Sequence, residues 1–181
     1  MRGAVRILGA VLLAAYPLAI WAGISMAGSR IAGLIVLGAL AIVLPLRIRA
    51  APELLGSGIA VAVLVLLSVA LDDQRFLLAM PVLVNMTLLA GFGASLLDGR
   101  LPVVERFARM TNDNLTPEEI RHCRTVTKVW CLFFVANASV SLLLAIFAPL
   151  AVWGLYNGAI AYVLMGAIFA GEYAIRKIRF G

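Results

Sequence analysis

The sequence predicts an all-α membrane protein: a polytopic bundle of about six transmembrane helices with a short amphipathic helix on the inner surface. Three observations predict this class. Hydrophobic residues make up 64% of the 181 residues and charged residues only 13%, which leaves too little polar surface for a soluble domain of this size. The apolar residues form long, nearly uncharged stretches. Those stretches are continuous rather than alternating, which favours helices over the strands of an outer-membrane barrel.

Six stretches are candidate spans, since about 20 apolar residues cross the hydrocarbon core of a bilayer. Their predicted bounds are 7–27, 31–46, 54–71, 76–97, 126–147 and 150–175. The second is short but carries no charge. We therefore predict a single integral membrane domain over residues 1–181, whose first helix is an uncleaved span rather than a signal peptide.

The basic residues predict the orientation. If both termini are cytoplasmic, all but Arg30 and Arg75 of the 15 basic residues lie on the inner side, as the positive-inside rule requires. The net charge of +6 is thus first a topology signal. Because the basic residues are spread over several inner loops, nucleic-acid binding is not predicted.

The cytoplasmic segment 98–124 is the long polar stretch of the chain. Apolar residues recur in it at helical spacing with charged residues between them: Leu101, Val104, Phe107 and Ala108, interrupted by Glu105, Arg106 and Arg109. This pattern predicts a short amphipathic helix on the inner membrane surface, with Pro102 in its first turn. Residues 111–114 then predict a turn.

A helix start follows the turn. Thr116 is a capping residue, Pro117 suits the first helical position, and Glu119 completes a capping box. No helix breaker follows until Pro149. The fifth helix is therefore predicted to begin in the cytoplasm and to continue directly into the bilayer.

Four arginines form the candidate site for an anionic ligand or partner: Arg106, Arg109, Arg121 and Arg124. Each pair is three residues apart on its helix, so each pair lies on neighbouring faces. If the turn folds the two helices together, the four guanidinium groups converge near the headgroups, and guanidinium suits phosphate because its planar fork bonds two oxygens. In the alternative interpretation they form a basic collar that only sets topology.

Lys128 and Glu172 extend the candidate site. Each lies one helical turn, about 6 Å, deeper than the nearest inner arginine. Because an isolated charge at this depth is costly, we predict a Lys128–Glu172 ion pair or a shared inner vestibule. The alternative is that each side chain extends separately to the interface.

The sequence contains few residues that indicate catalysis or the binding of a metal or cofactor. His122 is the single histidine, no catalytic triad or nucleophile elbow is present, and no metal site or cofactor is predicted. Gly154 and Gly158 predict close helix packing or a dimer face. The residues near predicted interfaces, where aromatic belt residues occur, are Trp21, Trp130, Trp153, Tyr156 and Tyr173.

From Arg106 to its end the chain resembles a family of small, uncharacterised bacterial inner-membrane proteins encoded in aryl-polyene and fatty-acid-type synthesis gene clusters. The residues that carry the resemblance are 106–110, 115–118, 121–124, 126–127, Trp130, 133–134, 147–150, Trp153, 172–173, Arg176 and 179–180. The family more often has Tyr than His at position 122, which argues against an essential His122. The resemblance implies acyl-chain assembly or export at the cytoplasmic face of a bacterial inner membrane.

Together these observations predict a non-catalytic accessory protein of the bacterial inner membrane. It would bind an acyl-lipid intermediate, or dock acidic synthesis or export partners such as an acyl carrier protein, at its basic inner face. Membrane lipids are the expected partners, and a homo-oligomer is compatible with the sequence. Two alternatives are an oligomeric lipid or metabolite carrier, or flippase, and a membrane-embedded acyl-transfer or lipid-modifying enzyme.

Overall fold

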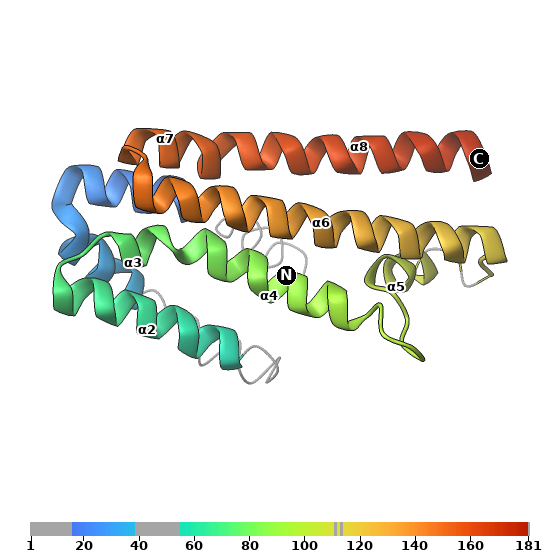
Figure 1. Ribbon diagram of the computed structural model, residues 1–181, viewed down its shortest axis with the longest axis horizontal. Coiled ribbons are helices and arrows are strands. Elements are labelled where there is room, and N and C mark those ends of the chain that lie inside the picture. The colour runs from blue at the N-terminus through green and yellow to red at the C-terminus, as the bar shows by residue number, and fades with distance from the viewer. Residues whose placement is uncertain (1–15, 39–54, 111, 113, 181) are drawn as a thin grey trace, which may run out of the picture. The chain divides into compact units, whose positions relative to one another are not determined.

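The chain is all-helical in the computed structural model, which describes residues 16–38, 55–110, 112 and 114–180 (Figure 1). No strand occurs in those ranges. Four helical segments are long and apolar enough to cross a membrane: Tyr16–Gly38, Arg75–Ala94, Pro117–Phe147 and Leu150–Phe180. A shorter apolar helix covers Ile59–Leu71. The predicted all-α class is confirmed for the described residues, and four helices are candidate membrane spans by length and composition. Residues 7–15, 39–46 and 54 of the predicted spans lie outside the described residues.

Figure 1 labels the α-helices that follow residue 38, and the π-helix η2 lies between α7 and α8. Their bounds are Leu55–Leu71 (α2), Arg75–Leu78 (α3), Met80–Ala94 (α4), Val103–Arg109 (α5), Pro117–Phe147 (α6), Leu150–Leu155 (α7), the π-helix Tyr156–Ile160 (η2) and Ala161–Phe180 (α8). The described residues belong to two compact units. The first unit contains 16–38, 55–83 and 140–162, and the second contains 84–110, 112, 114–139 and 163–180.

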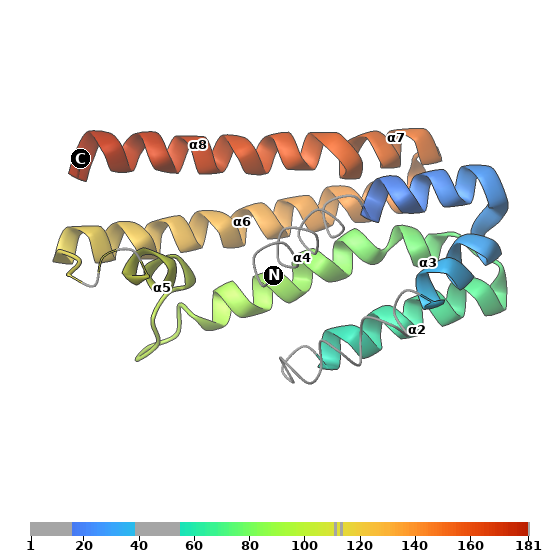
Figure 2. The same cartoon turned by 180° about the vertical axis from the view of Figure 1, so that it is seen from behind.

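In the first unit the chain reverses direction within Tyr16–Gly38 (Figure 2). Gly28 has φ +83°, in the left-handed region that favours glycine. A Cβ atom on Gly23 would lie 3.2 Å from the Cβ atom of Ala32, although nine residues of straight helix span about 13.5 Å. The reversal falls between the predicted first and second spans.

The reversal is joined to the turn after α2. The Ser29 hydroxyl donates a hydrogen bond of 2.8 Å to Asp72 Oδ1, and Arg30 lies 3.8 Å from Asp72 Oδ2. The charge pattern predicts that both turns are on the outer side. The contacts between the two turns agree with this prediction, because turns on the same side of a membrane can lie next to each other.

Trp153 of α7 lies at the centre of the first unit's core. Its side chain is fully buried, and its indole N–H donates a hydrogen bond of 3.1 Å to the Leu78 carbonyl. The cluster around it contains Ile20, Ile24, Ala32, Val65, Leu77, Leu78, Met80 and Ala145. The ring therefore packs among helices instead of lying on the surface, as an aromatic belt residue would.

Gly154 and Gly158 allow helix 16–27 to approach α7 and η2 closely. A Cβ atom on Gly154 would lie 2.7 Å from Trp21 Cδ1, and one on Gly158 would collide with Leu18. Because both glycines face the same helical segment, the prediction that they allow close helix packing is confirmed. Beside them, Asn157 accepts a hydrogen bond of 2.7 Å from Ser141 and donates one to the Trp153 carbonyl.

The second unit packs α4, α5 and α8 around the first half of α6. Its core contains Val126, Trp130 and Phe134 of α6. The Trp130 ring lies 4.7 Å from the Phe169 ring of α8, and Phe134 lies 5.1 Å from Phe92 of α4, measured between ring centroids. Since Trp130 is buried in this core, it too packs inside the protein rather than on its surface.

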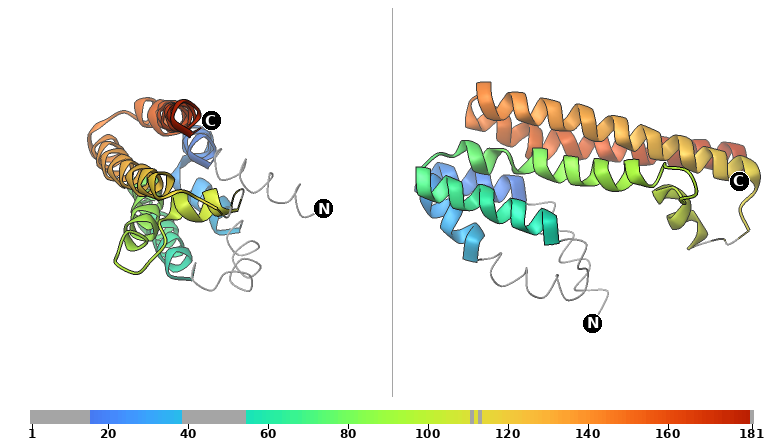
Figure 3. Two further views of the ribbon diagram at one scale, coloured as in Figure 1. Left: turned by 90° about the vertical axis from the view of Figure 1, so that its right-hand side faces the viewer. Right: turned by 60° about the horizontal axis from the view of Figure 1, so that its bottom comes forward.

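The short helix α5 lies beside the first turns of α6 (Figure 3). Two hydroxyl groups accept hydrogen bonds from its first backbone N–H groups: Ser95 Oγ from Val103 at 3.1 Å and Thr127 Oγ1 from Val104 at 3.4 Å. The predicted helix is present, although Pro102 is its N-cap rather than part of its first turn.

Candidate functional site

A reciprocal capping box begins α6, as predicted. The Glu119 backbone N–H donates to Thr116 Oγ1 at 3.3 Å, and the Thr116 backbone N–H donates to Glu119 Oε2 at 2.8 Å. These hydrogen bonds satisfy donors that the first helical turn leaves unpaired. The helix runs for 31 residues, from Pro117 to Phe147, so the box fixes its start just before Arg121, His122 and Arg124.

Glu119 precedes the predicted span 126–147, at the solvent-exposed start of α6. The hydrogen bond from the Thr116 backbone lowers the pKa of the Glu119 carboxyl, and the Thr116 hydroxyl adds to this effect. Because the folded-state pKa is lowered, the contribution of this carboxylate to stability is present at neutral pH and is lost as the pH falls through the folded pKa.

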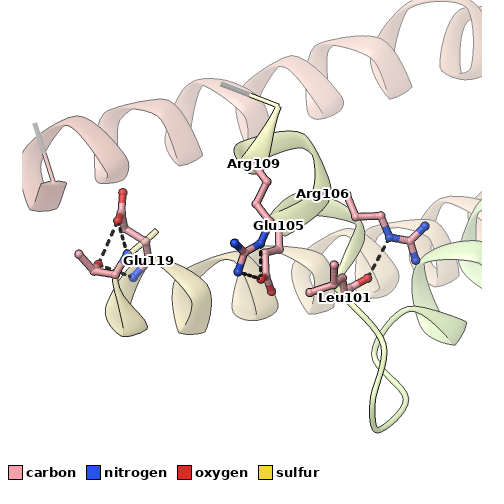
Figure 4. Close-up of polar contacts among 6 residues, drawn as sticks. Leu101, Glu105, Arg106, Arg109 and Glu119 are labelled. Atoms are coloured by element: carbon pink, nitrogen blue, oxygen red, sulfur yellow. Dashed lines mark hydrogen bonds and ion pairs between the residues drawn. The ribbon is translucent and has the colours of Figure 1, made fainter. Parts of the chain in front are cut away.

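The buried face of α5 carries a carboxylate, Glu105, which forms an ion pair with Arg109. Arg109 Nη2 and Nε donate hydrogen bonds of 2.7 and 2.9 Å to Glu105 Oε1 (Figure 4). The Glu105 side chain is only 3% exposed and that of Arg109 is 34% exposed, while Phe107 is exposed. The expectation that the charged residues of this helix form its outer face is therefore wrong for Glu105, because the close guanidinium compensates its burial.

The other predicted arginines have separate partners. Arg106 Nε donates a hydrogen bond of 3.0 Å to the Leu101 carbonyl (Figure 4). Arg124 Nη2 donates one of 2.7 Å to the Leu96 carbonyl, which lies just beyond the end of α4. Arg121 is exposed and lies 4.0 Å from the exposed Glu118. The guanidinium groups of Arg106, Arg109 and Arg124 thus bond within the protein.

The predicted Lys128–Glu172 ion pair is wrong. Glu172 Oε1 lies 3.8 Å from His122 Nε2, and the exposed Lys128 forms no ion pair with any described residue. The physical reason is rotational position. Lys128 follows His122 by six residues, which turns its side chain about 120° around the helix from the face that meets α8. The exposure of Lys128 matches the alternative in which it extends to the interface alone.

An open groove lies between the first turns of α6 and the last turn of α8. It is lined by Glu118, Arg121, His122, Thr125, Arg179 and Phe180. A second open groove shares Glu118, Arg121 and Phe180 with the first, and is also lined by Asn112, Asn114, Thr116, Pro117 and Glu119. Of the six predicted site residues, Arg121 lines these grooves, whereas Arg106, Arg109, Arg124, Lys128 and Glu172 do not.

His122, Arg179 and Phe180 are site residues that the sequence reasoning did not select. The His122 and Phe180 rings are 5.6 Å apart between centroids, at an angle of 63°. The sequence predicts Arg179 to be one of the inner-side charges, but nothing in its spacing indicates that α8 ends beside Arg121. That proximity follows only from the packing of α8 on α6.

No protein-family model, curated protein or solved structure matches this chain. The function proposed next is supported by the described residues and by the charge and hydropathy patterns of the sequence.

Proposed function

We propose that this chain is a non-catalytic accessory protein of a bacterial inner membrane. In this proposal it has six spans and cytoplasmic termini, and its basic inner end binds an anionic acyl lipid. The observation that carries the proposal is the groove of the second unit, where Arg121 of α6 and Arg179 of α8 meet at the ends of two apolar helices. An arginine side chain at the end of an apolar, membrane-length helix is suited to bind the phosphate of a lipid headgroup.

The reversal at Gly28 supports the six-span count. It divides Tyr16–Gly38 into two limbs that run past each other, and one limb falls in each of the predicted spans 7–27 and 31–46. The pairing of Ser29 and Arg30 with Asp72 then agrees with two outer turns that are nearly free of basic residues.

A lipid is favoured over an acidic protein partner such as an acyl carrier protein because exposed apolar side chains flank the basic residues. Ile178, in the last turn of α8, is 84% exposed, and Phe107 and Tyr173 are also exposed. A protein-docking surface of the same charge would not need apolar side chains directed outward from the helix between its basic residues. Acyl chains would cover them.

Cysteine labelling tests the orientation. In a background with Cys123 and Cys131 replaced by serine, we expect the thiol of Asn112→Cys to react with a membrane-impermeant thiol reagent only after the inner membrane is permeabilised. Gln74→Cys should react in intact cells whose outer membrane has been opened. Both residues are exposed. Periplasmic labelling of position 112 would contradict the proposed orientation.

Native mass spectrometry of the purified protein in detergent tests lipid binding. We expect phosphatidylglycerol to bind about tenfold more tightly than phosphatidylcholine with the same acyl chains, because each basic residue near a headgroup contributes about 1 kcal/mol. Raising the salt concentration should reduce this preference. Equal affinity for the two lipids would reject the proposed function, and salt-sensitive binding of an acyl carrier protein in that case would favour docking instead.

A further inference from the structure

We infer that the groove between α6 and α8 binds the phosphate group of an anionic lipid headgroup, with Arg121 and Arg179 as its two guanidinium contacts. This inference rests on the proposed function and names the site and the chemistry of its ligand. It replaces the four-arginine site that the sequence predicts with a pair of arginines, of which the sequence reasoning selected only one.

The contact between α6 and α8 brings these two arginines to one groove. His122 and Phe180 pack ring against ring, and Arg121 and Arg179 are the residues immediately before them in the chain. At this contact His122 Nε2 is buried and lies 3.8 Å from Glu172 Oε1. The His122 and Glu172 side chains are only 11% and 22% exposed. The two guanidinium groups therefore belong to backbone positions that are held by a packed contact.

The hydrogen-bonding capacity of these two arginines is largely unused. Among the described residues Arg179 forms no hydrogen bond or ion pair. The ion pair of Arg121 with Glu118 is 4.0 Å long and its side chains are 76% and 74% exposed, a kind of pair that contributes little. By contrast, Arg109 is bonded to Glu105 and Arg124 to the Leu96 carbonyl. The groove thus combines two arginines whose planar forks can each bond two phosphate oxygens.

The position of the groove favours a lipid over a soluble phosphate. The last turn of α8 carries Ile178, which is almost fully exposed, between Lys177 and Arg179. Alternating apolar and basic side chains at the end of a membrane-spanning helix are typical of the headgroup level. A headgroup in the groove would leave its acyl chains beside the exposed apolar residues of α8.

Arg179→Gln and its matched control Lys177→Gln test the inference. Both remove one positive charge from the last turn of α8, but only Arg179 lines the groove. By native mass spectrometry in detergent, we expect Arg179→Gln to weaken phosphatidylglycerol binding about tenfold more than Lys177→Gln does, as the loss of a charge-assisted hydrogen bond predicts. Arg121→Gln should weaken binding more than Arg106→Gln. Arg179→Lys should recover only part of the loss, because lysine lacks the fork.

The outcomes separate this inference from the proposed function. If wild-type protein prefers phosphatidylglycerol but Arg179→Gln and Lys177→Gln lose affinity equally, the groove inference is wrong and a nonspecific basic collar remains. If wild-type protein shows no preference, the proposed function itself fails. Glycerol 3-phosphate at millimolar concentration should not displace the lipid, and displacement would identify a soluble phosphate as the ligand. Equal thermal unfolding of all variants confirms that folding is unaffected, and Arg179→Lys supplies the comparison if Arg179→Gln unfolds.

Discussion

Replacing Trp153 with alanine is expected to destabilise the protein by about 3–5 kcal/mol. The indole ring is fully buried at the centre of the first unit's core. Alanine would leave a cavity where the ring now contacts apolar side chains, and the Leu78 carbonyl would lose its hydrogen bond from the indole N–H. Helices already inserted in lipid gain little hydrophobic free energy by associating, so close packing of this kind supplies much of their stability.

Reversible unfolding in mixed micelles of mild detergent and dodecyl sulfate measures this loss. Phe147→Ala is the matched control, because Phe147 is also aromatic and belongs to the first unit but is exposed. It should change the free energy of unfolding by less than about 0.5 kcal/mol. Trp153→Phe separates the two contributions, since it retains most of the ring but removes the hydrogen bond. An equal effect of Trp153→Ala and Phe147→Ala would contradict this account of the core.

Arg109→Gln is expected to destabilise the second unit by about 2–3 kcal/mol. The change leaves the buried Glu105 carboxylate without its cation, and removing one member of a buried pair costs about 3–5 kcal/mol. The expected value is lower because Arg109 remains partly exposed. Arg106→Gln, three residues earlier on the same helix, should have a much smaller effect, since the Arg106 guanidinium donates its hydrogen bond to the Leu101 carbonyl rather than to a buried carboxylate.

A double-mutant cycle isolates the pair. Arg109→Gln combined with Glu105→Gln should be less destabilising than Arg109→Gln alone, because the second change removes the uncompensated charge. The readout is the free energy of unfolding in the same micelles, with hydrogen exchange of the α5 amides as a local measure. Additive effects of the two changes would show that the carboxylate and guanidinium are not coupled.

Local patterns in the sequence are enough to predict the helices and several of their ends. The capping box at Thr116 and Glu119 was predicted from four consecutive residues and is present. The long α6 follows from the absence of a breaker between Pro117 and Pro149. The glycines at 154 and 158 indicated close packing correctly, because small residues allow backbones to approach whatever the partner is.

Local patterns did not identify which side chains meet. Counting residues from the membrane face estimates the depth of a side chain, and equal depth predicts Lys128 as the partner of Glu172. In the structure the side chain next to Glu172 is His122. Hydropathy could not separate Trp153, a core residue, from a tryptophan at the interface, because both are apolar side chains near a span end.

By itself, the sequence determined that this protein is helical, that its apolar segments suit a membrane and where α6 begins. These properties depend on composition and on hydrogen bonds between residues close in the chain. Only the tertiary structure decided that Arg121 and Arg179 share a groove while Arg109 and Arg124 bond within the protein. That distinction depends on the rotation of each helix about its axis, which is determined by packing between residues distant in sequence.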